Sequence, residues 1–200
     1  MTATTDLQSC VLRDLITAVS SAADAEQALH RIGKVAIDSL GDQMAVERPG
    51  ALRPGETDHA LTAFFLIAPS RRSMLLMAET GWPPEQHRLV IDIAEGRPGW
   101  VVANREALVL PNTDEDQVFT QIVTSRRMGS SMYAPLLWND EPLGLVSIAR
   151  QARGTFSAAD VPALEALAGI AAAAWIAHGG PDLLRDMAFG TPLALDRAWR

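Results

Sequence analysis

The feature that most constrains this chain is the segment 129–150, GSSMYAPLLWNDEPLGLVSIAR. It contains two apolar runs of strand length on either side of one polar turn. Strands joined by so short a turn are antiparallel neighbours, and their side chains alternate between the two faces of the sheet. Because both faces of this hairpin are apolar, we expect both to be covered, by helices of the same chain or by a partner.

A second apolar hairpin precedes the first. We expect a strand from about Ala60 to Ile67, a polar turn over residues 69–72, and a strand from Met74 to Ala78. These strands are also apolar on both faces. The two hairpins therefore predict one antiparallel sheet that lies between helical layers.

Helical spacing of apolar residues predicts three helices, over residues 6–19, 24–41 and 160–178. The second begins with a capping pattern, in which Asp24 accepts from the amides of the first turn and Gln27 reaches back. A capping box is also expected at the start of the third helix, between Ser157 and Asp160.

The section between the two hairpins is predicted to hold short elements. Residues 84–93 fit either a short strand or a helical turn, and 100–104 fit one or two helical turns after a glycine turn. A strand is expected over 107–110, and a short helix over Phe119 to Ser125.

These elements predict an α+β fold with a central antiparallel sheet of about five to six strands and helices on both faces. We expect a single domain over residues 1–178. Residues 42–58 have two Pro/Gly turns and few large apolar groups, so they are predicted to form an inserted surface loop without regular structure. Residues 179–200 are expected to be a C-terminal tail.

Charge and hydropathy narrow the classes of partner. The net charge is -7 and the 17 basic residues are scattered, so no nucleic acid is expected to bind. The longest apolar stretch, Ala166 to Ala177, is 12 residues long, shorter than the ~20 that a membrane span needs. No secretory signal is visible at the N-terminus, so we expect a cytoplasmic protein that does not bind a membrane.

Cys10 is the only cysteine. A single cysteine excludes an internal disulfide, a thiolate cage for zinc and any mechanism that needs two thiols in one chain.

Three segments resemble the GAF domain family, the small-molecule-sensing module of signalling proteins. They are Gly96 and Gly99 followed by WVVANREALVLPNTDED, then SSMYAPLLWNDEPLGLVSIAR, then TFSAADVPALEALAGIAAAAWI. The resemblance covers about residues 10–178. It implies that the hairpin of residues 129–150 is the floor of a ligand pocket, roofed by the short middle helices and their loops. It also implies a homodimer or a signalling protein partner, and it names no cofactor.

Seven side chains are candidates for ligand contact. Aromatic rings give large stacking areas, arginines clamp anions, and a hydroxyl and a phenol two residues apart share a strand face. Each also has a purely structural alternative, as a core aromatic, a solvated charge or a loop residue. The candidates are Trp82, Trp100, Phe119, Arg126, Arg127, Ser131 and Tyr133.

Asp114 and Asp116, in NTDED, are candidates for metal binding or acid–base chemistry, but their place in a loop after a proline favours turn chemistry. The four histidines show no paired spacing. Heme or metal binding by His59 or His87 stays open.

Three functions compete. The first is a non-catalytic ligand sensor. The second is an enzyme similar to free methionine-R-sulfoxide reductase, which needs a nucleophilic and a resolving thiol. By approximate alignment, Pro98 and Thr124 stand where that family has two of its cysteines, and Cys10 is expected outside the pocket.

The third function is an interaction scaffold whose pocket is filled by its own side chains. The methionines that could fill it are Met74, Met77, Met128 and Met132. We expect the first function, and expect that the protein is not an enzyme.

Overall fold

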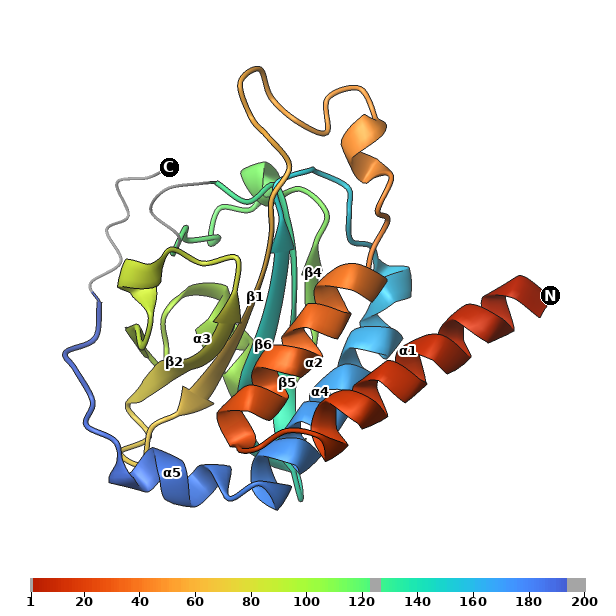
Figure 1. Cartoon of the computed structure of the whole chain (residues 1–200). Helices are drawn as coiled ribbons and strands as arrows, with labels where there is room; N and C mark the ends of the chain where they lie inside the picture. Colours follow the sequence, from red (N-terminus) through yellow and green to blue (C-terminus); the bar gives the residue numbers. More distant parts are fainter. Residues whose placement is uncertain (1, 123–126, 194–200) are drawn as a thin grey trace.

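The computed structural model describes residues 2–122 and 127–193, with side chains from residue 10 onward. Its centre is a six-stranded antiparallel sheet in the order β3-β2-β1-β6-β5-β4 (Figure 1). The strands are β1 (Ala60–Ile67), β2 (Ser73–Thr80), β3 (Val90–Asp92), β4 (Leu108–Leu110), β5 (Ser130–Trp138) and β6 (Glu141–Arg150). The α+β fold with one antiparallel sheet is confirmed.

Helices cover both faces of the sheet, as predicted (Figure 1). The helices are α1 (Thr2–Ser20), α2 (Ala25–Ser39), α3 (Gly96–Asn104), α4 (Val161–Ala177) and α5 (Gly180–Asp186). Helices α2 and α4 pack on one face, with α1 against α2, while α3 packs on the other face against β5 and β6.

The hairpin of β5 and β6 packs into two hydrophobic clusters, one on each face of the sheet. On β5, Met132, Ala134 and Leu136 face the layer of α2 and α4. Tyr133 points to the opposite face, where it joins a second cluster with Phe65 of β1. The alternation of side chains along a strand produces this division.

The predicted helix caps form. Asp24 Oδ1 accepts from the amide of Gln27 at 2.7 Å, and Gln27 Oε1 accepts from the amide of Ala23 at 2.9 Å. At the start of α4, the amide and the hydroxyl of Ser157 both donate to Asp160 Oδ2, at 2.8 and 2.9 Å.

By length and composition, Ala158–Ala177 could cross a membrane. Its buried residues, which include Leu164, Leu167 and Trp175, belong to the core formed with α2 and β5.

Two residues of the hairpin depend on the sheet topology. Strand β4 pairs with β5 only from Ser131 to Tyr133, so Pro135 lies beyond the end of β4. The N–H that Pro135 lacks therefore interrupts no hydrogen-bond ladder between β5 and β4. At Gly144, a Cβ atom would lie 2.0 Å from the carbonyl oxygen of Phe65 on β1. Glycine therefore permits the close approach of β1 and β6.

Between the hairpins, residues 84–93 contain both of the predicted alternatives, a 3-10 turn η2 (Pro84–Gln86) followed by β3. The prediction of a helix from residue 119 is wrong for residues 119–122, which have no regular structure. Asp116 Oδ1 accepts from the amides of Val118 and Phe119, at 2.9 and 2.7 Å, and so holds the chain in a turn. Residues 123–125 of that predicted helix lie outside the described residues.

Residues 42–58 form a surface loop that extends from the top of the molecule in Figure 1. The loop contains one 3-10 turn, η1 (Ala45–Glu47), where no regular element was expected. Asp42 explains it, because its carboxylate accepts from the amide of Met44 at 2.9 Å and pairs with Arg48. Local hydrogen bonds hold this turn where apolar burial is scarce.

Beyond residue 178 the chain forms α5 and returns to the domain. Leu184 of α5 is buried in the core shared with α4. Further along, the amide of Leu193 donates to the carbonyl of Val90 at 2.7 Å. This part of the expected tail packs against the folded domain.

Candidate functional site

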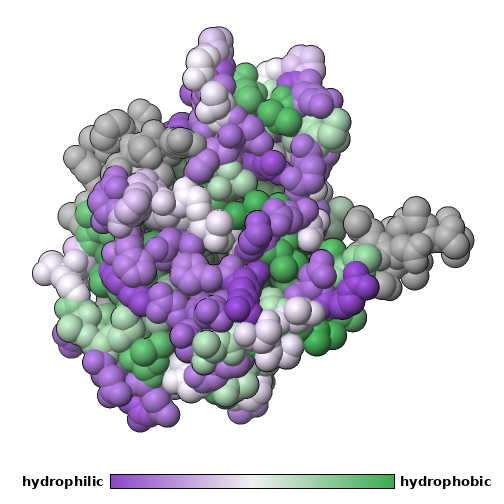
Figure 2. Space-filling view, viewed as in Figure 1, coloured by the Kyte–Doolittle hydropathy of each residue, from purple (hydrophilic) through white to green (hydrophobic). Residues whose placement is uncertain are grey.

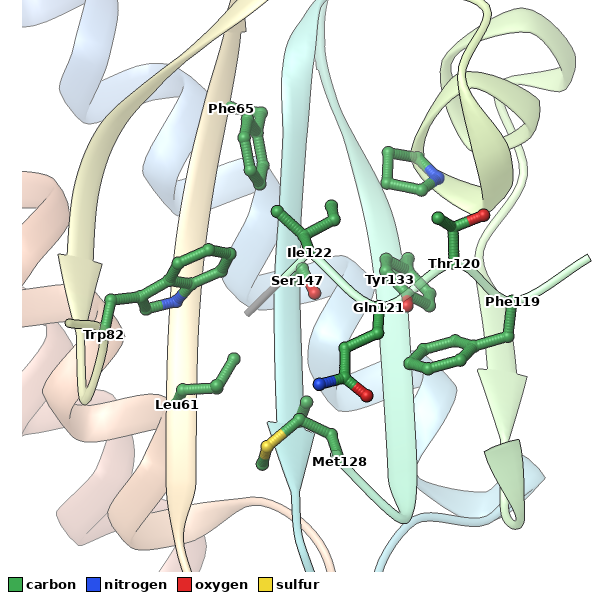
Figure 3. Close-up of a pocket in the computed structure, with 12 residues that line it drawn as sticks. Leu61, Phe65, Trp82, Phe119, Thr120, Gln121, Ile122, Met128, Tyr133 and Ser147 are labelled. Carbon is green, nitrogen blue, oxygen red and sulfur yellow. The ribbon is translucent and has the colours of Figure 1, made fainter. Parts of the chain in front are cut away.

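A cavity lies on the face of the sheet against which α3 packs, between the strands and the segments that cover them (Figure 3). Its volume is about 40 Å³. The floor comes from β1, β5 and β6, and the roof from α3 and the segment 119–122. The lining residues are Leu61, Phe65, Trp82, Pro98, Phe119, Thr120, Gln121, Ile122, Met128, Tyr133, Ser147 and Ala149.

The polar part of the floor is a pair of hydroxyls. Tyr133 on β5 and Ser147 on β6 are directly opposite each other in the antiparallel ladder, so their side chains share one face. Figure 3 shows both oxygen atoms between Trp82 and Phe119. Two adjacent hydroxyls offer both donors and acceptors to a bound molecule.

Tyr133 keeps its proton at neutral pH. Burial raises the pKa of its phenol from 10.0 to about 12, and the nearby hydroxyls of Ser131 and Ser147 offset only part of that rise. The negative charge of Asp116 also raises this pKa, and the positive charge of Arg97 lowers it. The phenol is therefore a neutral hydrogen-bonding group.

Trp82 forms one wall of the cavity. Its ring meets that of Phe65 edge to face, with the centroids 6.1 Å apart and an interplanar angle of 73°. The indole Nε1 is buried and has no hydrogen-bond partner in the described part of the chain. Trp82 and Phe65 give this side of the cavity a rigid apolar surface.

Asp116 holds the roof in place. Arg97 of α3 binds both of its oxygens, with Nε to Oδ1 at 3.1 Å and Nη2 to Oδ2 at 2.5 Å. Burial acts to raise the pKa of Asp116, but hydrogen bonds from Arg97 and from the amides of Val118 and Phe119 outweigh it and lower the pKa below 3.8. The ionised carboxylate thus ties the segment before Phe119 to α3.

Asp114 connects the roof to more distant segments. Its carboxylate pairs with Arg53, Arg127 and Arg153, each at 2.7 Å. Burial acts to raise the pKa of Asp114, but hydrogen bonds from Arg153 and Arg127 outweigh it and lower the pKa below 3.8. Arg127 also lies 5.9 Å from the centroid of the Phe119 ring, a cation–π contact with a lining residue.

Three of the seven sequence candidates line the cavity, namely Trp82, Phe119 and Tyr133. Trp100 does not, because α3 turns Val101 and Val102 toward the sheet and leaves Trp100 36% exposed. Arg126 lies outside the described residues.

The last two candidates lie next to the cavity and do not line it. Arg127 was expected to clamp a ligand anion, but its guanidinium binds Asp114 and lies over the Phe119 ring. Ser131 is fully buried on the same face as Tyr133, with no hydrogen-bond partner for its hydroxyl in the described chain.

Several lining residues were not among the sequence candidates. Ser147 follows from pairing the two strands of the hairpin, since it is the cross-strand partner of Tyr133. Thr120, Gln121 and Ile122 carry no such signal, because their positions depend on the turn at Asp116.

The idea that four methionines fill the cavity is wrong. Met128 lines it, but Met77 and Met132 point into the core on the helical face of the sheet. Met74 is buried on the cavity side of the sheet without lining the cavity. The space is therefore not occupied by these side chains.

No Cys, His, Asp or Glu side chain of the described chain lines the cavity. Cys10 is exposed on α1. Pro98 lines the cavity, and Thr124 lies outside the described residues. Within the described chain, no three His, Cys, Asp or Glu side chains are grouped to hold a metal ion.

Comparisons with known proteins agree with this architecture. A search of curated protein sequences finds no match. Among solved structures, the GAF domain of a phosphoenolpyruvate-protein phosphotransferase from Coxiella burnetii is 20% identical, with a TM-score of 0.69 over 86% of this chain and 94% of that one. The corresponding domain from Acinetobacter is 19% identical, with a TM-score of 0.68 over 87% and 95%.

Free methionine-R-sulfoxide reductase from Neisseria meningitidis, in complex with its substrate, is 18% identical, with a TM-score of 0.65 over 86% of this chain and 89% of that one. At these identities the structural likeness shows the fold alone. The sequence profile of the GAF domain matches residues 24–175, which is most of the chain. With its six-stranded sheet and helices on both faces, the protein belongs to the GAF domain family.

Proposed function

We propose that this protein is a non-catalytic sensory GAF domain, which binds a small molecule in the cavity over β1, β5 and β6 and signals through a homodimer or a partner protein. The observation that supports it most is the cavity itself. Ligand sites are mainly apolar hollows with a few converging polar groups on a rigid framework. Here the hydroxyls of Tyr133 and Ser147 lie among aromatic and aliphatic side chains, under a roof held by Arg97 and Asp116.

The positions of the reactive groups favour binding over catalysis. The reductase chemistry considered above needs two thiols at the substrate, and the one cysteine of this chain is exposed on α1. The carboxylates nearest the roof, Asp114 and Asp116, are held ionised by arginines, which makes them poor proton donors.

For the output we propose a homodimer through α1. Leu12 and Ile16 are four residues apart, share one side of this helix and are 53% and 59% exposed. Figure 2 shows apolar side chains along α1 on a face that is otherwise largely polar. A second copy would cover this apolar surface. We expect a Leu12→Glu, Ile16→Glu double variant to be monomeric by analytical ultracentrifugation, and an unchanged dissociation constant would contradict the dimer.

Native mass spectrometry of the freshly purified protein, followed by thermal melts with metabolites, tests the ligand. A ligand present at a concentration of 100 times its dissociation constant should stabilise the fold by about 2.7 kcal/mol. Ala149→Leu fills the cavity and should abolish that stabilisation. Ala163→Leu, the same change at an exposed position of α4, is the control and should retain it. No co-purifying molecule and no stabilisation by any compound would favour a scaffold instead.

A further inference from the structure

The size of the cavity limits its occupant. Its volume of about 40 Å³ is a few times the ~10–15 Å³ that one water molecule needs. It is well below the ~150 Å³ apolar cavity known to hold a benzene ring and the ~300 Å³ at which drug-sized sites begin. The cavity therefore suits a compact group of a few heavy atoms, smaller than an aromatic ring.

The lining also limits the charge of the occupant. Among the described lining residues only Tyr133 is ionisable, and it is neutral below pH 10. Just outside, Asp116 pairs with Arg97, and Asp114 is shared by Arg53, Arg127 and Arg153. None of these side chains lines the cavity, so an ion moved into it would lose its hydration without gaining a counter-ion among the described lining residues.

The hydroxyls of Tyr133 and Ser147 lie on the floor of the cavity, and the polar residues Thr120 and Gln121 lie in its roof. The Tyr133 and Ser147 hydroxyls belong to paired strands of the central sheet, so their spacing does not depend on the roof. On the opposite side, Trp82 and Phe65 present their aromatic rings, and the buried indole N–H of Trp82 has no hydrogen-bond partner in the described chain (Figure 3).

We propose that the ligand is a small uncharged molecule whose polar group, such as an amide, carbonyl or alcohol, binds the Tyr133 and Ser147 hydroxyls while its apolar part packs against Trp82 and Phe65. This inference rests on the proposed function, since it specifies the class of ligand for the same cavity. It adds Ser147 as a residue that determines specificity.

Two matched sets of compounds of similar size test it. They are acetamide with acetate and ethylamine, and isobutyramide with isobutyrate and isobutylamine. Each compound is titrated into the ¹⁵N-labelled full chain while the amide resonances of β5 and β6 and the indole resonance of Trp82 are followed. We expect an amide to shift these resonances with an affinity at least tenfold higher than that of its charged counterparts.

The hydroxyls are then removed singly. Because a neutral hydrogen bond contributes about 0.5–1.5 kcal/mol, Tyr133→Phe and Ser147→Ala should each weaken amide binding by about 2- to 10-fold. Ser20→Ala, at the exposed end of α1, is the control and should leave the affinity unchanged. The spectrum of each variant, recorded before any compound is added, establishes that the variant folds.

A charged compound that binds more tightly than its amide would overturn the inference, as would amide binding that is undiminished in both hydroxyl variants. Absence of any shift with all six compounds would also overturn it. The proposed function would survive these results if native mass spectrometry finds a bound molecule, so the two failures are distinguishable.

Discussion

At the scale of single residues, the most informative group is Tyr133. It is the only tyrosine of the chain, so the absorbance of tyrosinate reports directly on the floor of the cavity. Burial is the main cause of its raised pKa, which makes the ionisation of this side chain a measure of how well the roof excludes water.

We expect tyrosinate to form with a midpoint near pH 12 in the folded protein, and near 10 in urea. Since the pKa is higher in the folded state, this phenol contributes stability that is complete below pH 10 and is lost as the pH rises to 12. Spectrophotometric titration, with circular dichroism to establish that the chain is still folded, measures it. A folded-state midpoint near 10 would mean that water reaches the phenol freely.

At the scale of elements, α5 completes the core beyond the region that the family profile matches. Gly180, the first residue of α5, lies against Trp175 of α4, and a Cβ atom there would come within 2.1 Å of the indole ring. Trp175 is only 1% exposed and has no room to move aside. The absence of a side chain at residue 180 allows α5 to turn back onto α4.

Gly180→Ala should therefore lower the free energy of unfolding by about 1–3 kcal/mol, because the added methyl overlaps a buried ring. Urea denaturation followed by tryptophan fluorescence measures the change. Gly190→Ala is the matched control, since nothing lies within 4 Å of a Cβ atom there, and it should have little effect. Equal stability of the two variants would show that α5 does not pack as described.

At the scale of the whole molecule, Asp114 joins the inserted loop to the roof of the cavity. Arg53 comes from the loop, Arg127 precedes β5 and Arg153 follows β6, and all three converge on this one carboxylate. Arg153 also binds Glu56 of the loop at 2.6 Å, and hydrogen bonding from Arg153 is the main reason that the pKa of Glu56 lies below 4.5. The loop and the roof are thus held by the same ion pairs.

Asp114→Asn should destabilise the protein by about 1–3 kcal/mol at pH 7, because three arginines lose their shared partner. The pKa of Asp114 is lowered on folding, so its contribution is present above pH 3.8 and is lost as the pH falls below that value. The difference from wild type should therefore shrink toward pH 3. Urea denaturation across this range measures it.

Asp38→Asn serves as the control for that experiment. Asp38 makes one exposed pair with Lys34, 3.5 Å long, and its loss should change stability by less than about 1 kcal/mol. If the Asp114 variant kept the same deficit at every pH, the cluster would not act through the carboxylate charge.

Local sequence patterns predict most of the helices and strands and the resemblance to the family. Alternation along residues 129–150 and the caps at Asp24 and Ser157 are local patterns, so they predict strands and helices without reference to the rest of the chain. Tyr133 was found in the same way, since strand period alone places it on a defined face of the hairpin. Gly96 and Gly99 carry part of the GAF resemblance, but the turn expected there is instead the first part of α3, which begins at Gly96.

Which side chains line the cavity depends on contacts between segments that are far apart in the sequence. Arg53 and Asp114 are 61 residues apart in the sequence, and Arg153 and Asp114 are 39 residues apart. The position of Asp114, which binds Arg127, therefore depends on how distant segments pack together. The orientation of Trp100, the turn at residues 116–119 and the return of α5 depend on the same packing. Periodicity and capping act within a few residues, whereas an ion pair or a cavity wall exists only after the chain has folded.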